Sequence, residues 1–200
     1  MKLKEIISWV ICILIAIISA FFIKNYIFEL TKVEGNSMLP NFSDGQRLIV
    51  GKIGIKSNIK RNDIVIFEAP SDLKDGNLIA QYDEIKMNII KKCIFNTLEI
   101  NKKSYIKRVI ATEGESVQIN EGKVFINGKE INESFLKKGT YTNVPKQEFE
   151  TFVVPKGTVF VMGDNRNGSS DSRIFGCIPI SKIRGKVIFR IFPINKIGKI

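Results

Sequence analysis

Histidine is absent from this 200-residue chain, and cysteine occurs only three times. Without histidine, a Ser-His-Asp or Cys-His catalytic arrangement is excluded by composition alone. The cysteines, Cys12, Cys93 and Cys177, are odd in number and widely spaced, so they form no disulfide framework, although a pairing of Cys93 with Cys177 stays open. None of them has the spacing of a metal ligand, and we therefore expect no zinc or iron site.

Long runs of basic residues are also lacking. Lysine and arginine number 31 against 20 acidic residues, a net charge of +11, but no five basic residues follow one another. Such a charge would suit nucleic acid or an anionic membrane surface, but its even spread favours a solvated surface. We expect no nucleic-acid partner and a monomeric chain. The hydrophobic fraction of 44% excludes a disordered protein.

One uncharged segment is long enough to span a membrane. Ile6 to Ile23 are 18 residues, mostly Ile, Leu, Val and Phe, and as a helix they would be roughly 27 Å long, close to the hydrocarbon thickness of a bilayer. Lys2 and Lys4 precede the segment, which favours a cytosolic N-terminus. A cleavable signal peptide is the alternative, but Phe21-Phe22-Ile23 stands where small residues would be needed. A buried core helix of a soluble protein is a further alternative, which the apolar character of every face of the run disfavours in a chain of this size. Residues 1–24 are thus expected to form a single-pass anchor with a short cytoplasmic tip.

After the anchor, β-branched and aromatic runs alternate with Gly, Asn and Pro, which is typical of strands and turns. Strands are predicted at 47–50, 63–67, 105–110, 158–162 and 186–192. Glu121-Gly122, between Val117–Asn120 and Lys123–Ile126, predicts a tight hairpin, and Asn127-Gly128 predicts a further turn.

This pattern predicts a mostly β, barrel-like antiparallel domain after the helix. Residues 25–112 and 153–200 are expected to form the β core, and residues 113–152 an inserted β-hairpin lobe. Within the core, 72–103 is an insertion to which we assign no role. Ile85, Ile89 and Cys93 have helical spacing there and predict a short helix.

Ser37 and Lys107 are the candidate nucleophile and base. Ser37 lies between Gly35 and Pro40, a turn composition that can expose a hydroxyl and leave backbone N–H groups free. A serine hydroxyl is a poor nucleophile until a neighbouring base takes its proton, and a desolvated lysine can be that base. Since the chain has no histidine, Lys107 is the residue we expect in this role.

A lysine base needs an apolar environment. At its reference pKa of about 10.4 a lysine is almost entirely charged at neutral pH, so Lys107 must lose roughly 2–3 pKa units through burial. Tyr105 and Val109 share its strand face, while Arg108 points the opposite way. With Met38, they are the expected apolar neighbours of the Lys107 amine.

The chain closely resembles the bacterial type I signal peptidases in its apolar span, serine turn, Asp44–Arg47 strand start, Lys107-Arg108 pair and the polar segment 163–173. The resemblance implies Ser37 as nucleophile and Lys107 as general base. It further implies that Ser169 orients the lysine ammonium, that Asp171 and Arg173 form a supporting ion pair, and that Arg108 and Asp164 support the site from behind.

The resemblance also implies a substrate and a location. Members cut signal peptides from preproteins after small-x-small sequences such as Ala-x-Ala, and they need no metal or cofactor. The enzyme is expected in the cytoplasmic membrane of a bacterium, bound to the lipid bilayer, with the catalytic domain on the extracytoplasmic face. Only 13 residues separate Ile23 from Ser37, so the serine is expected near the membrane surface, where the substrate's own apolar helix ends.

The chain departs from the family pattern at three places. Asn41 stands where a threonine commonly follows the proline, and Ala111–Gly114 replaces a usual Gly-x-Pro-Gly. Gly35 occupies the position at which some members carry a serine that donates to the oxyanion, so the oxyanion hole would depend on the Ser37 backbone N–H.

Two other functions stay open. A self-cleaving Ser-Lys repressor peptidase would be cytosolic and would carry a DNA-binding domain where this chain has its apolar span. An inactive anchored β domain that binds substrates or peptidoglycan would keep the fold without needing Ser37 and Lys107, both of which are present.

Overall fold

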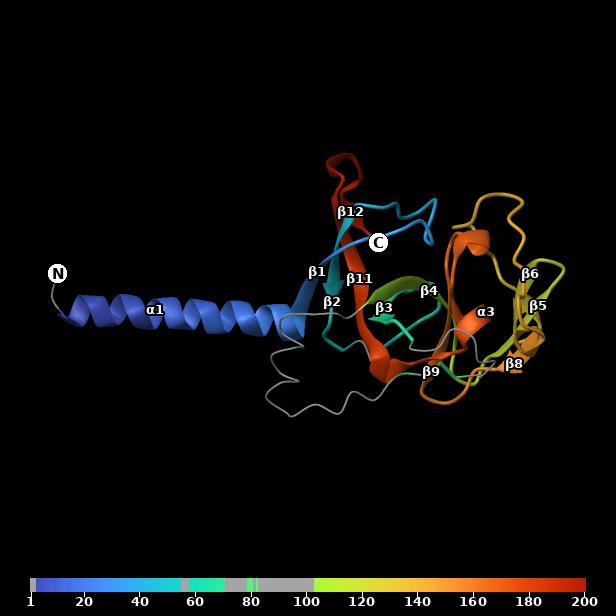
Figure 1. Ribbon diagram of the computed structural model, residues 1–200, viewed down its shortest axis with the longest axis horizontal. Coiled ribbons are helices and arrows are strands. Elements are labelled where there is room, and N and C mark those ends of the chain that lie inside the picture. The colour runs from blue at the N-terminus through green and yellow to red at the C-terminus, as the bar shows by residue number, and fades with distance from the viewer. Residues whose placement is uncertain (1–2, 55–57, 71–78, 81, 83–102) are drawn as a thin grey trace.

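The computed structural model describes residues 3–54, 58–70, 79–80, 82 and 103–200 (Figure 1). The helix predicted around Ile85, Ile89 and Cys93 lies outside these residues. The described chain consists of one long helix followed by a β domain.

The long helix, α1 (Leu3–Phe22), projects from the β domain as a rod and continues into a π-helical turn, η1 (Ile23–Ile27) (Figure 1). No residue of α1 is buried, and the stretch Leu3–Ile27 reaches a mean hydropathy of 3.0. Among the described residues it is the one helix long and apolar enough to cross a membrane. A helix that is apolar on all sides and has no buried residue is suited to a bilayer rather than to water.

The β domain is built on an eight-stranded antiparallel sheet with the order β1-β2-β11-β3-β4-β9-β10, and β12 pairs with β11. All five strands predicted from the sequence are confirmed here. The strands are β1 (Phe28–Lys32), β2 (Arg47–Gly51), β3 (Ile64–Glu68), β4 (Ser104–Thr112), β9 (Thr158–Met162), β10 (Ile178–Pro179), β11 (Ile183–Phe192) and β12 (Gly198–Lys199).

The large sheet is strongly curved. Although β2, β11 and β3 separate β1 from β4 in the sheet, residues of β1 and β4 line one cleft of about 830 Å³. β11 contains a bulge between Ile183 and Gly185, and bulges increase the local twist of a sheet. A Cβ at Gly185 would lie 2.3 Å from Val50 Cγ1, so this position must be glycine for β11 to approach β2 so closely.

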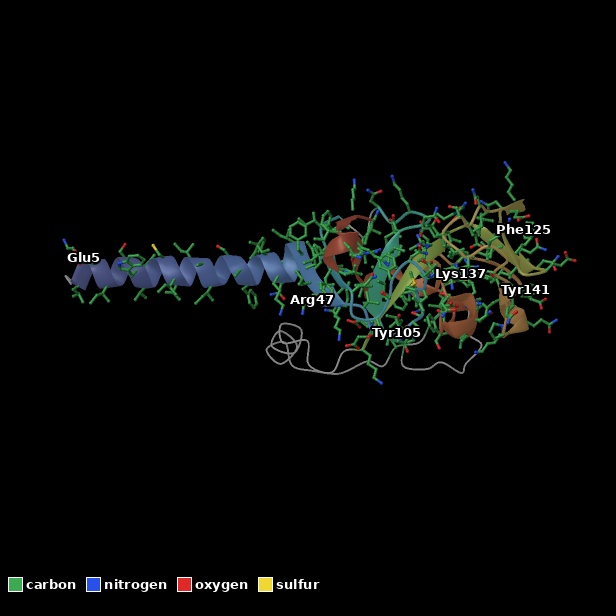
Figure 2. The ribbon with its side chains drawn as sticks, turned by 90° about the horizontal axis from the view of Figure 1, so that it is seen from above. Glu5, Arg47, Tyr105, Phe125, Lys137 and Tyr141 are labelled. Atoms are coloured by element: carbon green, nitrogen blue, oxygen red, sulfur yellow. The ribbon has the colours of Figure 1, made fainter. Side chains whose placement is uncertain are left out.

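A smaller antiparallel sheet has the order β7-β6-β5-β8, and it lies at the end of the molecule away from α1 (Figures 1 and 2). Its strands are β5 (Ser116–Asn120), β6 (Lys123–Ile126), β7 (Lys129–Glu130) and β8 (Thr151–Val153). The predicted hairpin is confirmed: Glu121 and Gly122, with φ of 48° and 79°, have the left-handed conformation that a type I′ turn requires. Asn127 and Gly128 form the second turn, with φ of 53° and 76°.

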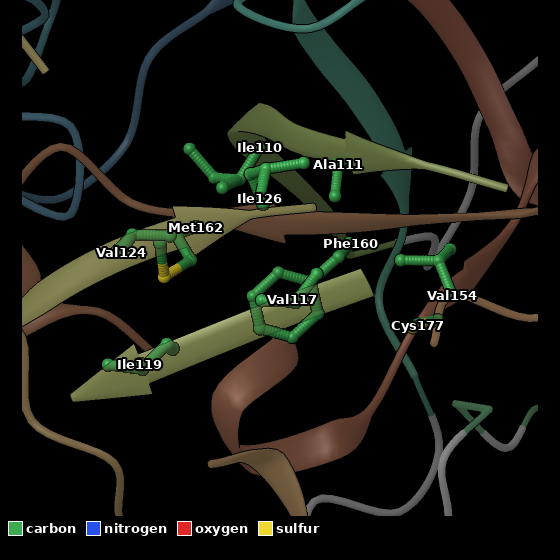
Figure 3. Packing of buried hydrophobic residues seen from close by; sticks show 10 residues of the cluster. All are labelled: Ile110, Ala111, Val117, Ile119, Val124, Ile126, Val154, Phe160, Met162 and Cys177. Carbon is green, nitrogen blue, oxygen red and sulfur yellow. The ribbon is translucent and has the colours of Figure 1, made fainter. Parts of the chain in front are cut away.

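The two sheets pack together through buried side chains of β4 and β9 on one side and of β5 and β6 on the other (Figure 3). Short helical segments complete the domain: η3 (Gln147–Phe149), η4 (Arg166–Gly168), α3 (Ser172–Phe175), η5 (Ile180–Lys182) and η6 (Ile194–Lys196). The expected class, a mostly β antiparallel domain after one apolar helix, is confirmed. The division into a core and an inserted lobe at 113–152 stays a prediction; the small sheet lies in that range except for Val153, the last residue of β8.

Candidate active site

The turn after β1 and the middle of β4 bring Ser37 and Lys107 together. Lys107 Nζ lies 2.7 Å from Ser37 Oγ, within hydrogen-bonding distance, although the two residues are 70 positions apart in the sequence. Lys107 is only 3% exposed, and Ser37 is half-buried where the cleft between β1 and β4 reaches it. A buried amine in contact with a hydroxyl at the edge of a cleft is the arrangement that a lysine base requires.

The surroundings of the Lys107 amine are apolar. On β3, Val65 pairs directly with Lys107, and the Tyr105 ring centroid lies 5.3 Å from Nζ. Burial lowers the pKa of Lys107 to about 8, while the carboxylates of Asp171 and Asp164 act in the opposite direction. The amine therefore loses its proton far more easily than an exposed lysine does.

The position of Ser37 is held by backbone hydrogen bonds to the segment after β9. Asn165 N–H donates to Ser37 O at 3.0 Å, and the Asn165 side chain donates to Asn36 O at 3.1 Å. On the other side of the turn, Gly35 has a φ of 81°, and its N–H donates to Asp44 Oδ1 at 2.8 Å. Because this N–H is already used, Gly35 has neither a side chain nor a backbone donor to offer an oxyanion.

Ser169 lies close to the serine turn. A Cβ on Gly163 would lie 2.2 Å from Ser169 Oγ and 2.5 Å from Ser37 O, so glycine is required where the two segments meet. Ser169 Oγ is buried and has no hydrogen-bond partner among the described residues. The structure thus places Ser169 beside the turn of Ser37 without showing the expected bond to Lys107, and its role stays a prediction.

Asp171 and Arg173 form a buried ion pair behind the site. The Arg173 guanidinium donates from Nε to Asp171 Oδ1 and from Nη2 to Asp171 Oδ2, each at 2.8 Å. Asp171 Oδ2 also accepts a 3.0 Å hydrogen bond from Gly163 N–H, and Arg173 donates to the carbonyl oxygens of Asn143 and Arg166. The pair fixes the segment that carries Ser169.

Arg108 and Asp164 form a second bidentate pair, with distances of 2.8 and 2.7 Å. Asn41 donates to Asp164 Oδ2 at 2.8 Å and to Phe135 O at 2.7 Å. It stands where a threonine is common in the family that this sequence resembles. The Arg108 guanidinium stacks on the Phe135 ring at 4.0 Å from its centroid. Asn41 thereby links the serine turn to both Asp164 and the coil that follows β7.

Arg166 and Glu133 are two residues of the site for which the sequence alone predicts no role. Arg166 is buried and forms an ion pair with Glu133, and its guanidinium also donates to the Thr142 hydroxyl and to Gly163 O. The sequence feature that could have pointed to Arg166 is its position within the polar segment 163–173. Its partners Glu133 and Thr142 lie in a polar coil that the sequence does not distinguish from a solvated loop.

No cluster of three His, Cys, Asp or Glu side chains that could hold a metal ion occurs in the part of the chain that the structure describes. Cys177 is a free, buried thiol whose pKa is raised by burial to about 12, and Cys93 lies outside the described residues.

Comparison with known proteins agrees with the resemblance in the motifs. The family model described as "Signal peptidase, peptidase S26" matches residues 6–192. A probable signal peptidase I-1 of Synechocystis is 31% identical over 94% of this chain and 83% of its own length. A signal peptidase IB of Staphylococcus aureus is 30% identical over 96% of this chain and 93% of its own length.

A crystal structure of a signal peptidase I from Enterococcus faecalis covers 65% of this chain and 97% of its own, with 25% identity and a TM-score of 0.44. The family model extends from within α1 to the last residue of β11, and both relatives align over more than nine-tenths of this sequence. This chain belongs to the signal peptidase family, peptidase S26.

Proposed function

We propose that this chain is a membrane-anchored serine endopeptidase that removes N-terminal signal peptides from secreted preproteins after small-x-small sequences. Ser37 is the nucleophile and Lys107 the general base. The observation that carries this proposal is the 2.7 Å contact between a buried lysine amine and the serine hydroxyl. Family membership supports the removal of signal peptides as the reaction.

In the first half of the reaction, the neutral Lys107 amine takes the proton of Ser37 Oγ while Oγ attacks the carbonyl carbon of the scissile peptide bond. The carbonyl oxygen becomes an oxyanion, for which the Ser37 backbone N–H is the donor we propose. The Lys107 ammonium then gives its proton to the leaving amine, which departs as the N-terminus of the mature protein.

The second half repeats these proton transfers with water. The signal peptide is now an ester on Ser37 Oγ, and neutral Lys107 takes a proton from a water molecule that attacks the ester carbonyl. Lys107 returns that proton to Ser37 Oγ as the ester breaks, which frees the carboxylate end of the signal peptide. Each half needs Lys107 without its proton at the start, so apolar surroundings are part of the mechanism.

The short distance along the chain between the anchor and Ser37 fits a substrate that is itself bound to the membrane. The turn with Ser37 begins after β1, and only nine residues separate Ile27, the end of η1, from Ser37. A signal peptide whose own apolar helix spans the same bilayer presents its cut site at a similar depth. We therefore place the β domain at the outer face of the cytoplasmic membrane, with the N-terminus inside.

The full-length protein in detergent micelles is expected to cleave a synthetic precursor once, directly after an Ala-x-Ala sequence that follows an apolar segment. The termini of both products are read by mass spectrometry. A matched precursor with Phe at the first and third positions before the cut should stay intact. The proposal is wrong if the first precursor is not cleaved or is cleaved elsewhere.

The pH dependence of cleavage should show the lowered pKa of Lys107. With a pKa of about 8, kcat/KM is expected to rise with pH, to level off above pH 8, and to be about a hundredfold lower at pH 6 than on the plateau. The chain has no histidine to produce such a limb. Initial rates at low substrate concentration between pH 5.5 and 10 test this, and a rate that still rises about tenfold per pH unit up to pH 10 would show that Lys107 is not the desolvated base.

A further inference from the structure

The serine turn, residues 36–42, is held at both of its ends. At the first end, the backbone and the side chain of Asn165 donate hydrogen bonds to two carbonyl oxygens of the turn. At the far end, Phe42 is buried, and its N–H donates to the carbonyl oxygen of Met38 at 2.9 Å. Met38 directly follows Ser37 and belongs to the same hydrophobic cluster as Phe42. The position of the Ser37 hydroxyl therefore depends on how the far end of the turn is held.

Arg190 of β11 contacts this far end from outside the turn. Arg190 Nη2 donates to Asn41 O at 3.0 Å, and the guanidinium carbon lies 4.9 Å from the centroid of the Phe42 ring. A cation above an aromatic ring is attracted by the negative face of the ring. The hydrogen bond joins residues that are 149 positions apart, so β11, the last long strand of the chain, supports a turn near the beginning of the chain (Figure 1).

The packing of β11 does not by itself call for an arginine at this position. Arg190 pairs with Leu48 of β2, and Val187 pairs with Val50. Directly opposite residues of antiparallel strands have their side chains on the same face of the sheet. Leu48, Val50 and Val187 are all buried in the cluster that contains Phe42. An apolar side chain would continue this buried row, whereas Arg190 brings a charged group to its end, next to the serine turn.

An ion pair does not account for Arg190 either. It forms none with any residue that the structure describes. Its Nε is buried and has no hydrogen-bond partner among these residues, and a buried N–H without a partner lowers the stability of the folded state. The contacts that the structure does show for the guanidinium both go to the serine turn.

The turn is also the route by which Arg190 can act on the reaction. Arg190 is not among the described residues that line the cleft at Ser37, so it does not contact a peptide bound there. Its charge is not among the influences that shift the pKa of Lys107. What it can alter is the position of Ser37 Oγ, which lies 2.7 Å from Lys107 Nζ. A displacement of about 1 Å at a reacting group can lower a rate about a hundredfold.

We propose that Arg190 is a positioning residue for the reaction. Its hydrogen bond to Asn41 O and its contact with the Phe42 ring hold the far end of the serine turn, and this keeps Ser37 Oγ in place against the Lys107 amine. The proposal rests on the proposed function, because it presupposes that peptides are cut at Ser37.

Single-turnover cleavage by the Arg190→Met variant tests this role. The full-length protein in detergent micelles is used in excess over the Ala-x-Ala precursor, and the first-order rate constant is followed to its plateau with rising enzyme concentration. Methionine can still cover the Phe42 ring but has no donor for Asn41 O. The plateau is expected to fall by roughly tenfold or more. The enzyme concentration that gives half of the plateau should stay within about twofold of the wild type, since Arg190 does not line the cleft.

This measurement separates positioning from a loss of folded protein. If the variant merely contained less folded enzyme, more total enzyme would be needed to reach half of the plateau, while the plateau itself would not change. That result overturns the proposal, as does a variant with both values of the wild type. Failure of the proposed function would instead appear as no cleavage of the precursor by the wild-type protein.

Lys199→Met is the matched control. Lys199 is exposed on β12 and pairs with Phe189, so its side chain lies on the face of the sheet opposite to that of its neighbour Arg190. The control should keep both wild-type values, and a fall in its plateau equal to that of Arg190→Met would overturn the role of the turn contact. If Arg190→Met shows no cooperative thermal unfolding, Arg190→Gln decides alone. Its amide is too close to the strand to reach Asn41 O, so the same fall is expected, and an unchanged plateau overturns the proposal.

Discussion

Replacing Lys107 with methionine is expected to lower kcat/KM for precursor cleavage by at least about a thousandfold. Methionine has nearly the length of lysine and suits the apolar surroundings of β3 and Tyr105, but it cannot take the proton of Ser37. The rate of product formation at pH 8.5, measured by chromatography of the peptide products, tests this. Retained activity would show that the base is another group.

The same variant is expected to be more stable than the wild type at neutral pH. The pKa of Lys107 falls from 10.5 to about 8 on folding, so the buried ammonium opposes folding at every pH below 8, by roughly 3 kcal/mol. Between pH 8 and 10.5 the unfolded state binds more protons at this residue, and wild-type stability rises relative to the variant. Urea unfolding at pH 7 and pH 10 should show the difference between the two proteins shrinking with pH.

Two matched variants separate the loss of activity in Lys107→Met from its gain in stability. Ser37→Ala should lose activity as fully as Lys107→Met, but without the pH-dependent gain in stability. Lys123→Met alters an exposed lysine of the small sheet that pairs with Glu130, and it should leave both activity and stability nearly unchanged. An unstable but active Lys107→Met protein would contradict both the role and the environment assigned to this lysine.

The features predicted most reliably from the sequence were those determined by local chemistry. Glu121-Gly122 and Asn127-Gly128 favour left-handed backbone conformations, so the sequence alone identifies the turns of the small sheet. The absence of histidine leaves a lysine as the candidate base for Ser37, and the resemblance to the signal peptidases points to Lys107; the structure places these two side chains in contact. Their catalytic roles remain predictions that the variants above address.

The supporting contacts could not be predicted, because they join residues far apart in the chain. Asn41 and Asp164 are 123 positions apart, and Glu29 and Arg184 are 155 apart. Nothing local distinguishes Asn41 from a solvated turn residue, or Arg184 from the other basic residues of a chain with 31 of them. Such partners follow from how the sheets curve and pack, which depends on the whole fold.

Replacing Asp171 with alanine is expected to destabilise the protein by about 3–5 kcal/mol. Both members of the Asp171–Arg173 pair are buried, with 0% and 2% exposure, so the change leaves the Arg173 guanidinium in the interior without its carboxylate. It also removes the acceptor of Gly163 N–H. Urea unfolding at pH 7 measures the loss. Glu130→Ala, in the exposed pair with Lys123, is the control and should cost less than about 1 kcal/mol.

The more conservative Asp171→Asn variant tests whether the Asp171–Arg173 pair is purely structural or also influences the pKa of Lys107. After burial, the Asp171 carboxylate is the largest influence on the pKa of Lys107, and it raises that pKa, whereas Arg173 lowers it. Asparagine keeps one acceptor oxygen, replaces the other by an NH2 donor and removes the negative charge. The influence that raises the pKa of Lys107 is then lost while that of Arg173 remains, which favours the neutral amine. The acidic limb of kcat/KM should therefore move to lower pH than in the wild type. A variant that folds with reduced stability but keeps the wild-type limb would show that the ion pair supports the segment 163–173 without setting the basicity of Lys107.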